Sequence, residues 1–288
     1  MGLKNKLKNN ENLYYALSNK KVLFGLTLFT IILLLAILGP YFTPYEYDGY
    51  ESMGYQPPSR DNYFGTTMFG QDVFTMTVYG LRRTIQLGLI AGAIALTLGC
   101  LIGFFSGYYS GTIIDEGLML ITNLFLTLPT IPVIIIISAY LQARGLFVIA
   151  FLVGITSWPW VARAVRSQTL SIKNQEFVSL SKISGLNTLR ILKEDIAANM
   201  FSYVFMTCIL LFNGTILAAV GLEFLGLGPT TGISLGAVIN LAVSWNAVEL
   251  GFWWWAIIPG LVLTLMVASL YFINTGLDQV FNPRLREM

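Results

Sequence analysis

Six long apolar stretches constrain the fold of this chain more than any other feature. A helix needs about 20 mostly apolar residues to cross the hydrocarbon core of a bilayer, and runs of roughly this length recur along the 288 residues. They cover residues 22–40, 84–106, 117–141, 146–162, 201–222 and 253–274. Because backbone polar groups in lipid must be hydrogen-bonded within the segment itself, the sequence predicts an all-α polytopic membrane protein with six transmembrane helices.

The composition supports a membrane location. Only 11% of the residues are charged and 55% are hydrophobic, whereas soluble domains carry roughly 25% charged residues. We therefore expect a multi-pass protein of the cell membrane, in contact with the lipid bilayer. The net charge of +2 is too small to indicate a nucleic acid partner.

Basic residues are distributed unevenly among the segments that join the apolar stretches. The predicted outer segments hold only four of the 17 basic residues, namely Arg60, Arg82, Arg83 and Arg144. The remaining 13 lie in the N-terminal segment, in the segment between spans four and five, and in the C-terminal tail. Since cytoplasmic segments carry the excess of Lys and Arg, we expect both termini and the segment between spans four and five to be cytoplasmic.

The chain divides into four parts along its length. Residues 1–21 form a cytoplasmic segment, residues 22–40 the first transmembrane helix, and residues 41–83 an extracytoplasmic loop rich in Tyr, Gly and Pro. We expect this loop to end in a short helix at about residues 71–79. Residues 84–288 form a core of five further helices.

Glycine recurs at every fourth position from the second span into the turn after it, at Gly99, Gly103, Gly107 and Gly111. Glycines at this spacing line one face of a helix and let a neighbouring backbone approach closely. We expect this face to pack against another helix of the same chain, and an interface with a partner subunit is the alternative. In the third span, Pro129 and Pro132 predict a kink.

The one long polar stretch in the interior of the chain follows the fourth span. It carries six basic residues, and Phe177, Leu180 and Ile183 recur every three positions before Gly185 interrupts the pattern. This pattern predicts a helix, a bend at the glycine and a second short amphipathic helix with Leu186, Leu189 and Leu192. An apolar stripe framed by charge is typical of a docking surface for a partner. The alternative is an amphipathic segment that lies on the membrane surface.

Several residue types are missing from places where other functions need them. The interiors of the six predicted spans contain no Asp, Glu, Lys or Arg, and the whole chain has no His. Ion-coupled carriers usually place ionisable groups at membrane depth, so their absence argues against such a carrier. We predict no catalytic residues and no metal site. The chain also lacks the G-x-x-x-x-G-K-[ST] phosphate-binding motif, so any uphill movement would draw energy from another polypeptide.

Five motifs, in the same order along the chain, carry a resemblance to a known family. They are FGTTMFGQDVFTMTVYG, CLIGFFSGYYSGTIIDE, the W-x-x-x-A-R-x-V-R-x-x-x-L-S pattern from Trp158 to Ser171, LEFLGLG from Leu222 to Gly228, and IIPGL with GLDQVFNPR near the end. The chain resembles the permease subunits of ABC importers, and is most similar to the second (C-type) permease of dipeptide, oligopeptide and nickel transporters. Where that family has Glu-Ala-Ala, this sequence has Ser179, Leu180 and Ser181.

The resemblance implies a non-enzymatic transport subunit with several partners. These are a homologous second permease, two ATP-binding subunits that bind ATP and Mg, and an extracytoplasmic solute-binding protein. Residues 163–200 would form a cytoplasmic helical coupling loop between spans four and five. The residues expected to contact an ATPase subunit are Glu176, Phe177, Leu180, Ile183, Gly185 and Arg190.

The resemblance leaves the solute open. Peptides are the expected cargo, and oligosaccharides or nickel are the alternatives. An ion-coupled secondary carrier and a membrane scaffold protein without transport activity are more distant alternatives. Glu223, at the outer end of the fifth span, is a candidate contact to the transport path or the binding protein, and an exposed interfacial charge is the other interpretation.

Overall fold

The computed structural model describes residues 15, 17–50, 53–141 and 145–281. Within these ranges every named element is a helix, and an isolated bridge between Thr66 and Asp72 is the only strand-like pairing. Five helices are long and apolar enough to cross a membrane, and a bent pair raises the number to six. The five are α3 (Lys20–Phe42), α4 (Val73–Tyr108), α7 (Leu146–Lys173), α10 (Phe201–Phe224) and α12 (Trp253–Phe281). The predicted all-α polytopic fold is confirmed.

The third predicted span is a broken helix. It consists of α5 (Ile113–Thr127) and α6 (Thr130–Tyr140), which are bent by 80° relative to each other. The break falls at Leu128 and Pro129, and Pro132 lies in the first turn of α6. Proline lacks a backbone N–H and its ring crowds the preceding turn, so the predicted kink is confirmed as a change of direction between two helices.

The start of α4 differs from the prediction. A short helix at residues 71–79 followed by a separate span is wrong, because α4 runs without a break from Val73 to Tyr108. The Asp72 carboxylate caps this helix by accepting hydrogen bonds from the Thr75 N–H and hydroxyl, both at 2.8 Å. Burial raises the pKa of the Asp72 carboxyl, although these two hydrogen bonds oppose the shift.

Contacts along the chain group it into two compact units. Unit 1 contains the described parts of residues 1–88, 141–149 and 216–288. Unit 2 contains those of residues 89–140 and 150–215. The long helices α4, α7 and α10 therefore contribute residues to both units.

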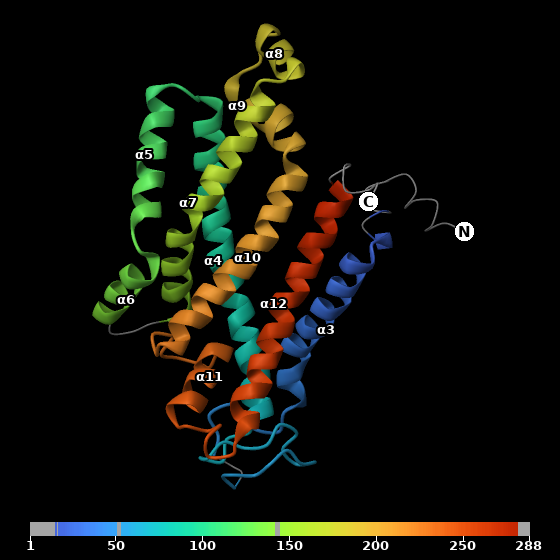
Figure 1. The fold of residues 1–288 in the computed structure, drawn as a ribbon, viewed down its shortest axis with the longest axis vertical. Coiled ribbons are helices and arrows are strands. Elements are labelled where there is room, and N and C mark those ends of the chain that lie inside the picture. Colours follow the sequence, from blue (N-terminus) through green and yellow to red (C-terminus); the bar gives the residue numbers. More distant parts are fainter. Residues whose placement is uncertain (1–14, 16, 51–52, 142–144, 282–288) are drawn as a thin grey trace. The chain divides into compact units, whose positions relative to one another are not determined.

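In unit 1, α3 and α12 run side by side (Figure 1). Glycines allow the close approach: a Cβ atom at Gly25 would lie 2.7 Å from the Ser269 carbonyl oxygen, and one at Gly276 would lie 2.8 Å from the Val22 backbone nitrogen. Small residues permit such backbone contact between membrane helices. The pair is also joined by a hydrogen bond from the side chain of Asn19 to that of Gln279, at 3.1 Å.

A buried cluster fixes the start of α4 against the start of α12 and against α11 (Leu235–Ser244). The indole N–H of Trp254 donates to the Thr66 carbonyl oxygen at 3.0 Å, which adds a polar contact to this packing. The cluster contains Val73, Met76, Val238, Ala242, Ala247, Trp254 and Trp255.

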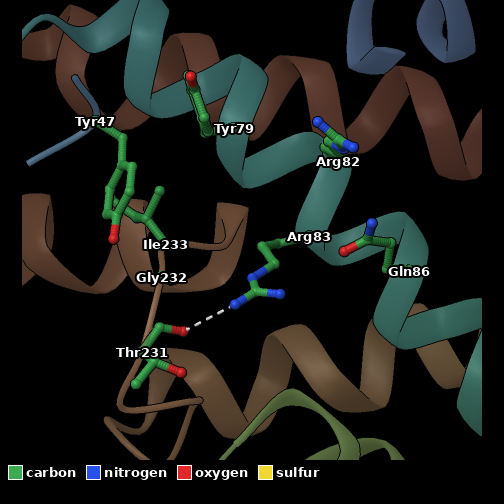
Figure 2. A pocket seen from close by; sticks show the side chains of 8 residues that line it. All are labelled: Tyr47, Tyr79, Arg82, Arg83, Gln86, Thr231, Gly232 and Ile233. Atoms are coloured by element: carbon green, nitrogen blue, oxygen red, sulfur yellow. Dashed lines mark hydrogen bonds between the residues drawn. The ribbon is translucent and has the colours of Figure 1, made fainter. Parts of the chain in front are cut away.

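Beside this cluster, unit 1 contains a cavity of about 390 Å³ (Figure 2). Residues of α4 and of the segment that precedes α11 form most of its lining, and Tyr47 from the loop after α3 completes it. The lining residues are Tyr47, Tyr79, Arg82, Arg83, Gln86, Thr231, Gly232 and Ile233.

In unit 2, the glycine face of α4 lies against α7. A Cβ atom at Gly103 would lie 2.7 Å from the Ala162 carbonyl oxygen, and one at Gly107 would lie 2.8 Å from the Arg166 carbonyl oxygen. Gly99 has the same role one turn earlier, against Trp158 and Val161. The fourth glycine of the predicted series, Gly111, does not belong to this contact, because it lies in the turn after α4 with a φ of 82°.

Replacing Gly25 with Ala tests the contact between α3 and α12. The new methyl group would meet backbone atoms that cannot move aside without separating the helices, so we expect a loss of about 1–3 kcal/mol in stability. Gly260→Ala, also in α12, is the matched control because nothing lies within 4 Å of its Cβ position. Thermal unfolding in detergent measures both variants, and equal melting temperatures would contradict the glycine contact.

Candidate functional site

The segment that joins α7 to α10 contains most of the residues singled out by the sequence. α7 continues to Lys173, so the first part of the predicted coupling loop belongs to that helix. The connection then folds into α8 (Glu176–Ile183), the single turn α9 (Thr188–Arg190) and the π-helix η1 (Ile191–Ala197) (Figure 1). We call residues 174–200 the knob.

One side of α8 presents apolar side chains to the exterior. Phe177 is 41% exposed, Leu180 is 64% exposed and Ile183 is 84% exposed. Glu176 lies in the first turn of the same helix, where a negative charge is favoured by the helix dipole. Three large apolar side chains left uncovered on one short helix form a surface that a partner could bury.

The other side of α8 is anchored. Val178 is fully buried in a cluster with Val165 and Ile172 of α7 and with Ile191 and Ile196 of η1. Burying a branched aliphatic side chain contributes about 1.5–3 kcal/mol relative to leaving it exposed. The knob is therefore packed onto the ends of the long helices, so that its position follows theirs.

Gly185 ends α8 in a left-handed conformation with a φ of 77°. Its N–H donates to the Lys182 carbonyl oxygen at 3.1 Å, and the next N–H, of Leu186, donates to the Ser181 carbonyl oxygen at 3.2 Å. These two bonds define a Schellman motif, whose C′ position favours glycine because a Cβ atom strains this φ. Gly185 is a helix C-cap that turns the chain toward α9.

The short second helix expected from Leu186, Leu189 and Leu192 has a different form. Leu192 is buried, Leu189 is exposed, and Leu186 is partly buried against the same cluster as Val178. The Asn187 side chain accepts a hydrogen bond from the Arg190 N–H at 2.8 Å and so caps α9. Arg190 forms an exposed ion pair with Glu194, at 2.9 Å.

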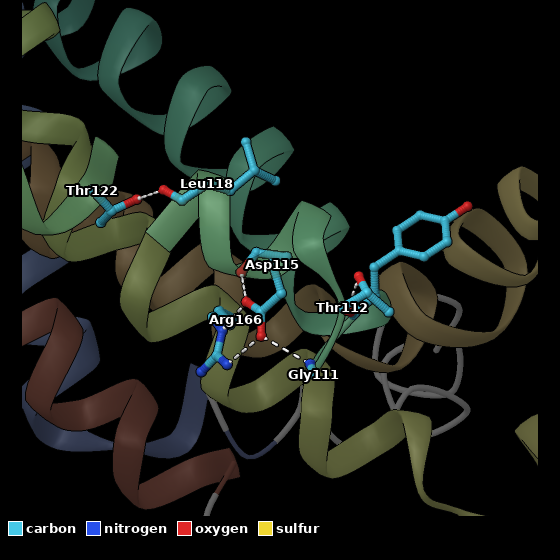
Figure 3. Close-up of polar contacts among 8 residues, drawn as sticks. Gly111, Thr112, Asp115, Leu118, Thr122 and Arg166 are labelled. Carbon is cyan, nitrogen blue, oxygen red and sulfur yellow. Dashed lines mark hydrogen bonds and ion pairs between the residues drawn. The ribbon is translucent and has the colours of Figure 1, made fainter. Parts of the chain in front are cut away.

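A buried carboxylate near the knob was not among the residues singled out by the sequence. Asp115, in the first turn of α5, receives two hydrogen bonds of 2.7 Å from the guanidinium of Arg166 in α7 (Figure 3). It also accepts hydrogen bonds from the Ser106 hydroxyl and from the Gly111 N–H. Bidentate bonds between Arg and a carboxylate are among the strongest polar contacts in proteins. This arrangement, which we call the Asp115 node, ties together α4, α5 and α7.

A second polar contact links α8 directly to α4. The ammonium groups of Lys173 and Lys182 lie 5.8 Å and 5.4 Å from the centre of the Tyr108 ring. Cations at this distance over an aromatic face gain about 0.5–1 kcal/mol at exposed sites. Tyr108 therefore lies between the last turn of α7 and the last turn of α8.

Sequence reasoning could have found only part of this arrangement. An aspartate immediately after a glycine-containing turn, as in GTIIDE, is a common way to begin a helix. Nothing in the sequence pairs Asp115 with Arg166, which is 51 residues away. The spacing of the apolar residues in α8 predicted its exposed stripe. That Val178 anchors the helix could be seen only from the packing.

The structure contradicts one of the two interpretations of Glu223. It is 1% exposed, so the interpretation as an exposed interfacial charge is wrong. Its side chain packs against Gly228 and Gly236, and a Cβ atom at Gly228 would lie 2.9 Å from its Cγ atom. A contact between Glu223 and the transport path or a binding protein stays a prediction.

The polar side chains of the described residues can be examined for a metal site. Within them, no three side chains of His, Cys, Asp or Glu gather closely enough to hold a metal ion. The strongest polar cluster, the Asp115 node, uses its donors and acceptors internally. The knob presents an apolar surface on a short helix and packs against α7 through its buried side.

Comparison with protein families identifies relatives over most of the chain. Residues 95–287 match the family described as "Binding-protein-dependent transport system inner membrane component". Residues 15–58 match the "N-terminal TM domain of oligopeptide transport permease C".

Individual relatives match almost the full length. The dipeptide transport system permease protein DppC of Bacillus subtilis is 32% identical, over 93% of this chain and 83% of its own length. The oligopeptide transport system permease protein OppC of the same organism is also 32% identical, over 94% of this chain and 88% of its own length. Among solved structures, an inward-facing MetNI methionine ABC transporter matches with a TM-score of 0.57 and 17% identity, over 71% of this chain and 94% of that chain. This last match shows a shared fold.

Replacing Asp115 with Asn tests the node. Arg166 would keep its charge while losing its ionised partner, and breaking a largely buried pair in this way costs up to about 3–5 kcal/mol. Because the Arg166 side chain is 28% exposed, we expect a smaller loss of about 2 kcal/mol. Thermal unfolding in detergent measures the loss.

The exposed pair supplies the control for this measurement. Both side chains of the Arg190–Glu194 pair are more than half exposed, so Glu194→Gln should change stability by no more than about 0.5 kcal/mol. In addition, combining Asp115→Asn with Arg166→Gln should restore part of the stability. Equal effects of Asp115→Asn and Glu194→Gln would contradict the importance of the node.

Proposed function

This chain belongs to the family of inner-membrane components of binding-protein-dependent transport systems, and we propose that it serves an ATP-driven importer of dipeptides or oligopeptides. It is a multi-pass inner-membrane permease subunit of an ABC transporter and does not catalyse a reaction itself. In such a system it acts with ATPase subunits and a solute-binding protein.

The proposed cargo is supported by the relatives. Both Bacillus subtilis proteins carry names that specify dipeptide or oligopeptide transport, and the N-terminal match is to a domain of oligopeptide permeases. The chain covers more than four fifths of the length of each of these relatives. We propose that the chain is the second, C-type permease of its complex, paired with a homologous permease and two ATPase subunits that bind ATP and Mg.

The knob is the proposed contact to one ATPase subunit. Its exposed side chains, Phe177, Leu180 and Ile183, form an apolar stripe of the kind that inserts into a groove on a partner. The excess of basic residues around it indicates the cytoplasmic side, where ATPase subunits operate. Gly185 sets the direction of the chain after the stripe, and Arg190 of α9 is exposed in an ion pair with Glu194.

Movement of the ATPase subunits can pass through the knob to the membrane. Val178 and Ile191 pack the knob against α7, and the cation–π contacts at Tyr108 connect α8 with α4. The Asp115 node then joins α7 to α5 and to the end of α4. A displacement of α8 would therefore move several helices together, because packed interiors transmit strain and resist compression.

The cargo is tested with the cognate extracytoplasmic binding protein. Isothermal titration calorimetry against a set of short peptides and a set of oligosaccharides should show tight binding of peptides. Tight binding of an oligosaccharide and no binding of peptides would overturn the peptide assignment. The result would leave the membership of the permease family unchanged.

The docking surface is tested by two isoleucines that are equally exposed. Ile183 is 84% exposed at the end of the stripe, and Ile113 is 85% exposed at the start of α5. Ile183→Ser removes apolar area from the proposed contact and should weaken ATPase binding about tenfold or more, given about 1.5–3 kcal/mol for a buried isoleucine. Ile113→Ser should leave it unchanged. Affinity is measured by titrating purified ATPase subunits onto the permease pair in nanodiscs, and equal effects would contradict the assignment.

A further inference from the structure

The cavity in unit 1 has a size and lining suited to a small ligand. Its volume of about 390 Å³ falls in the range of about 300–1,000 Å³ that is usual for small-molecule sites. It lies at the start of α4, and Tyr47 comes from the segment predicted to be extracytoplasmic. The cavity is therefore on the side from which an imported solute arrives.

Two arginines give the cavity a positive charge. Arg82 and Arg83 are two of only four basic residues in the outer segments of the chain, where basic residues are generally depleted. No carboxylate of the described residues lies within 4.0 Å of either guanidinium, including Glu223, which lines a small neighbouring cavity together with Arg83. A guanidinium without an acidic partner can bind an anion.

Contacts with the segment that precedes α11 hold the Arg83 side chain in position. Its guanidinium donates a long hydrogen bond of 3.4 Å to the Thr231 carbonyl oxygen (Figure 2). A Cβ atom at Gly232 would lie 2.9 Å from two of its nitrogens, and Gly232 has a φ of 77°. Glycine at this position therefore both adopts the turn and leaves room for the guanidinium.

The remaining lining complements a carboxylate attached to an organic group. Tyr79, Arg83 and Gln86 are spaced by four and three residues, so they share one face of α4. The centre of the Tyr79 ring lies 5.6 Å from that of Tyr47, and the two rings form an aromatic part of the lining. Gln86 adds an amide that can both donate and accept hydrogen bonds.

We propose that this cavity binds the terminal carboxylate of an incoming peptide, an inference that rests on the proposed function. Every peptide carries this carboxylate whatever its sequence, and the fork of a guanidinium matches its two oxygens. The two tyrosine rings accommodate the last side chain, and Gln86 pairs with the last peptide group. An acidic side chain of the binding protein is the other anion that reaches this side, and the cavity volume favours the smaller ligand.

The test uses the complete transporter in proteoliposomes with its binding protein. Uptake of a peptide with a free carboxylate is compared with uptake of the same peptide as a C-terminal amide, each supplied at a concentration that saturates the binding protein. In the Arg83→Gln variant, uptake of the free acid should fall about tenfold, as expected for the loss of a charge-assisted pair. Uptake of the amide should change less than twofold.

Two further variants distinguish carboxylate binding from a purely structural role of Arg83 and from a general loss of outer positive charge. Arg60→Gln removes an exposed outer arginine that does not line the cavity, and it should change neither uptake rate. Gln86→Glu places a negative charge one helical turn from Arg83 and keeps the arginine itself. It should lower uptake of the free acid selectively, even if Arg83→Gln proves unstable.

Four outcomes would overturn the proposal. If uptake of the acid and of the amide fell equally in Arg83→Gln and in Gln86→Glu, Arg83 would have a structural role only. The binding protein without peptide can also be tested for its stimulation of ATP hydrolysis. Loss of this stimulation in Arg83→Gln would show that Arg83 serves to dock the binding protein. No uptake of either peptide by the unsubstituted transporter would overturn the peptide function itself, whereas normal uptake of both by the variants would overturn only the carboxylate site.

Discussion

The pairing of Arg166 with Asp115 is the interaction on which the knob-bearing half of the structure depends. It joins two helices whose charged groups lie 51 residues apart, and it adds the Ser106 hydroxyl and the Gly111 N–H from a third segment. A guanidinium near the membrane needs an ionised and fully hydrogen-bonded partner, because an unpaired charge is costly to remove from water. The glycine face of α4 brings the helices close enough for the node to form. Packing and ion pairing therefore reinforce each other at the same junction.

The two faces of α8, the first helix of the knob, have different surroundings. Val178 is buried against α7 and η1, whereas Ile183 and Leu180 are left uncovered. A surface that is apolar and exposed gains stability only when a partner covers it, and a surface that is apolar and buried transmits displacement to whatever it contacts. In the function proposed above, the exposed face would receive movement from an ATPase subunit, and the buried face would pass it to α7 and η1.

Glycine has two distinct uses in this protein. At Gly25, Gly103 and Gly107 the missing side chain lets a neighbouring backbone approach to distances that a methyl group would prevent. At Gly185 and Gly232 the essential property is the positive φ, which ends α8 in one case and shapes the wall of the outer cavity in the other. Sequence spacing indicated the first use at Gly103 and Gly107, where glycines recur every four residues, but not at Gly25. It could not separate Gly111 from its neighbours, because the helix ends before that residue is reached.

The sequence alone determined the all-helical membrane fold, the kink in the third span and the exposed stripe of the knob. Each follows from a local rule: apolar length, proline chemistry and helical periodicity act within about 20 residues. The tertiary structure decided which charges meet and which side chains are covered. The partner of Arg166, the burial of Glu223 and the meeting of Tyr47 with Arg83 in one cavity all join residues from separate segments. Such contacts depend on how helices pack in space, and no pattern within a single segment encodes them.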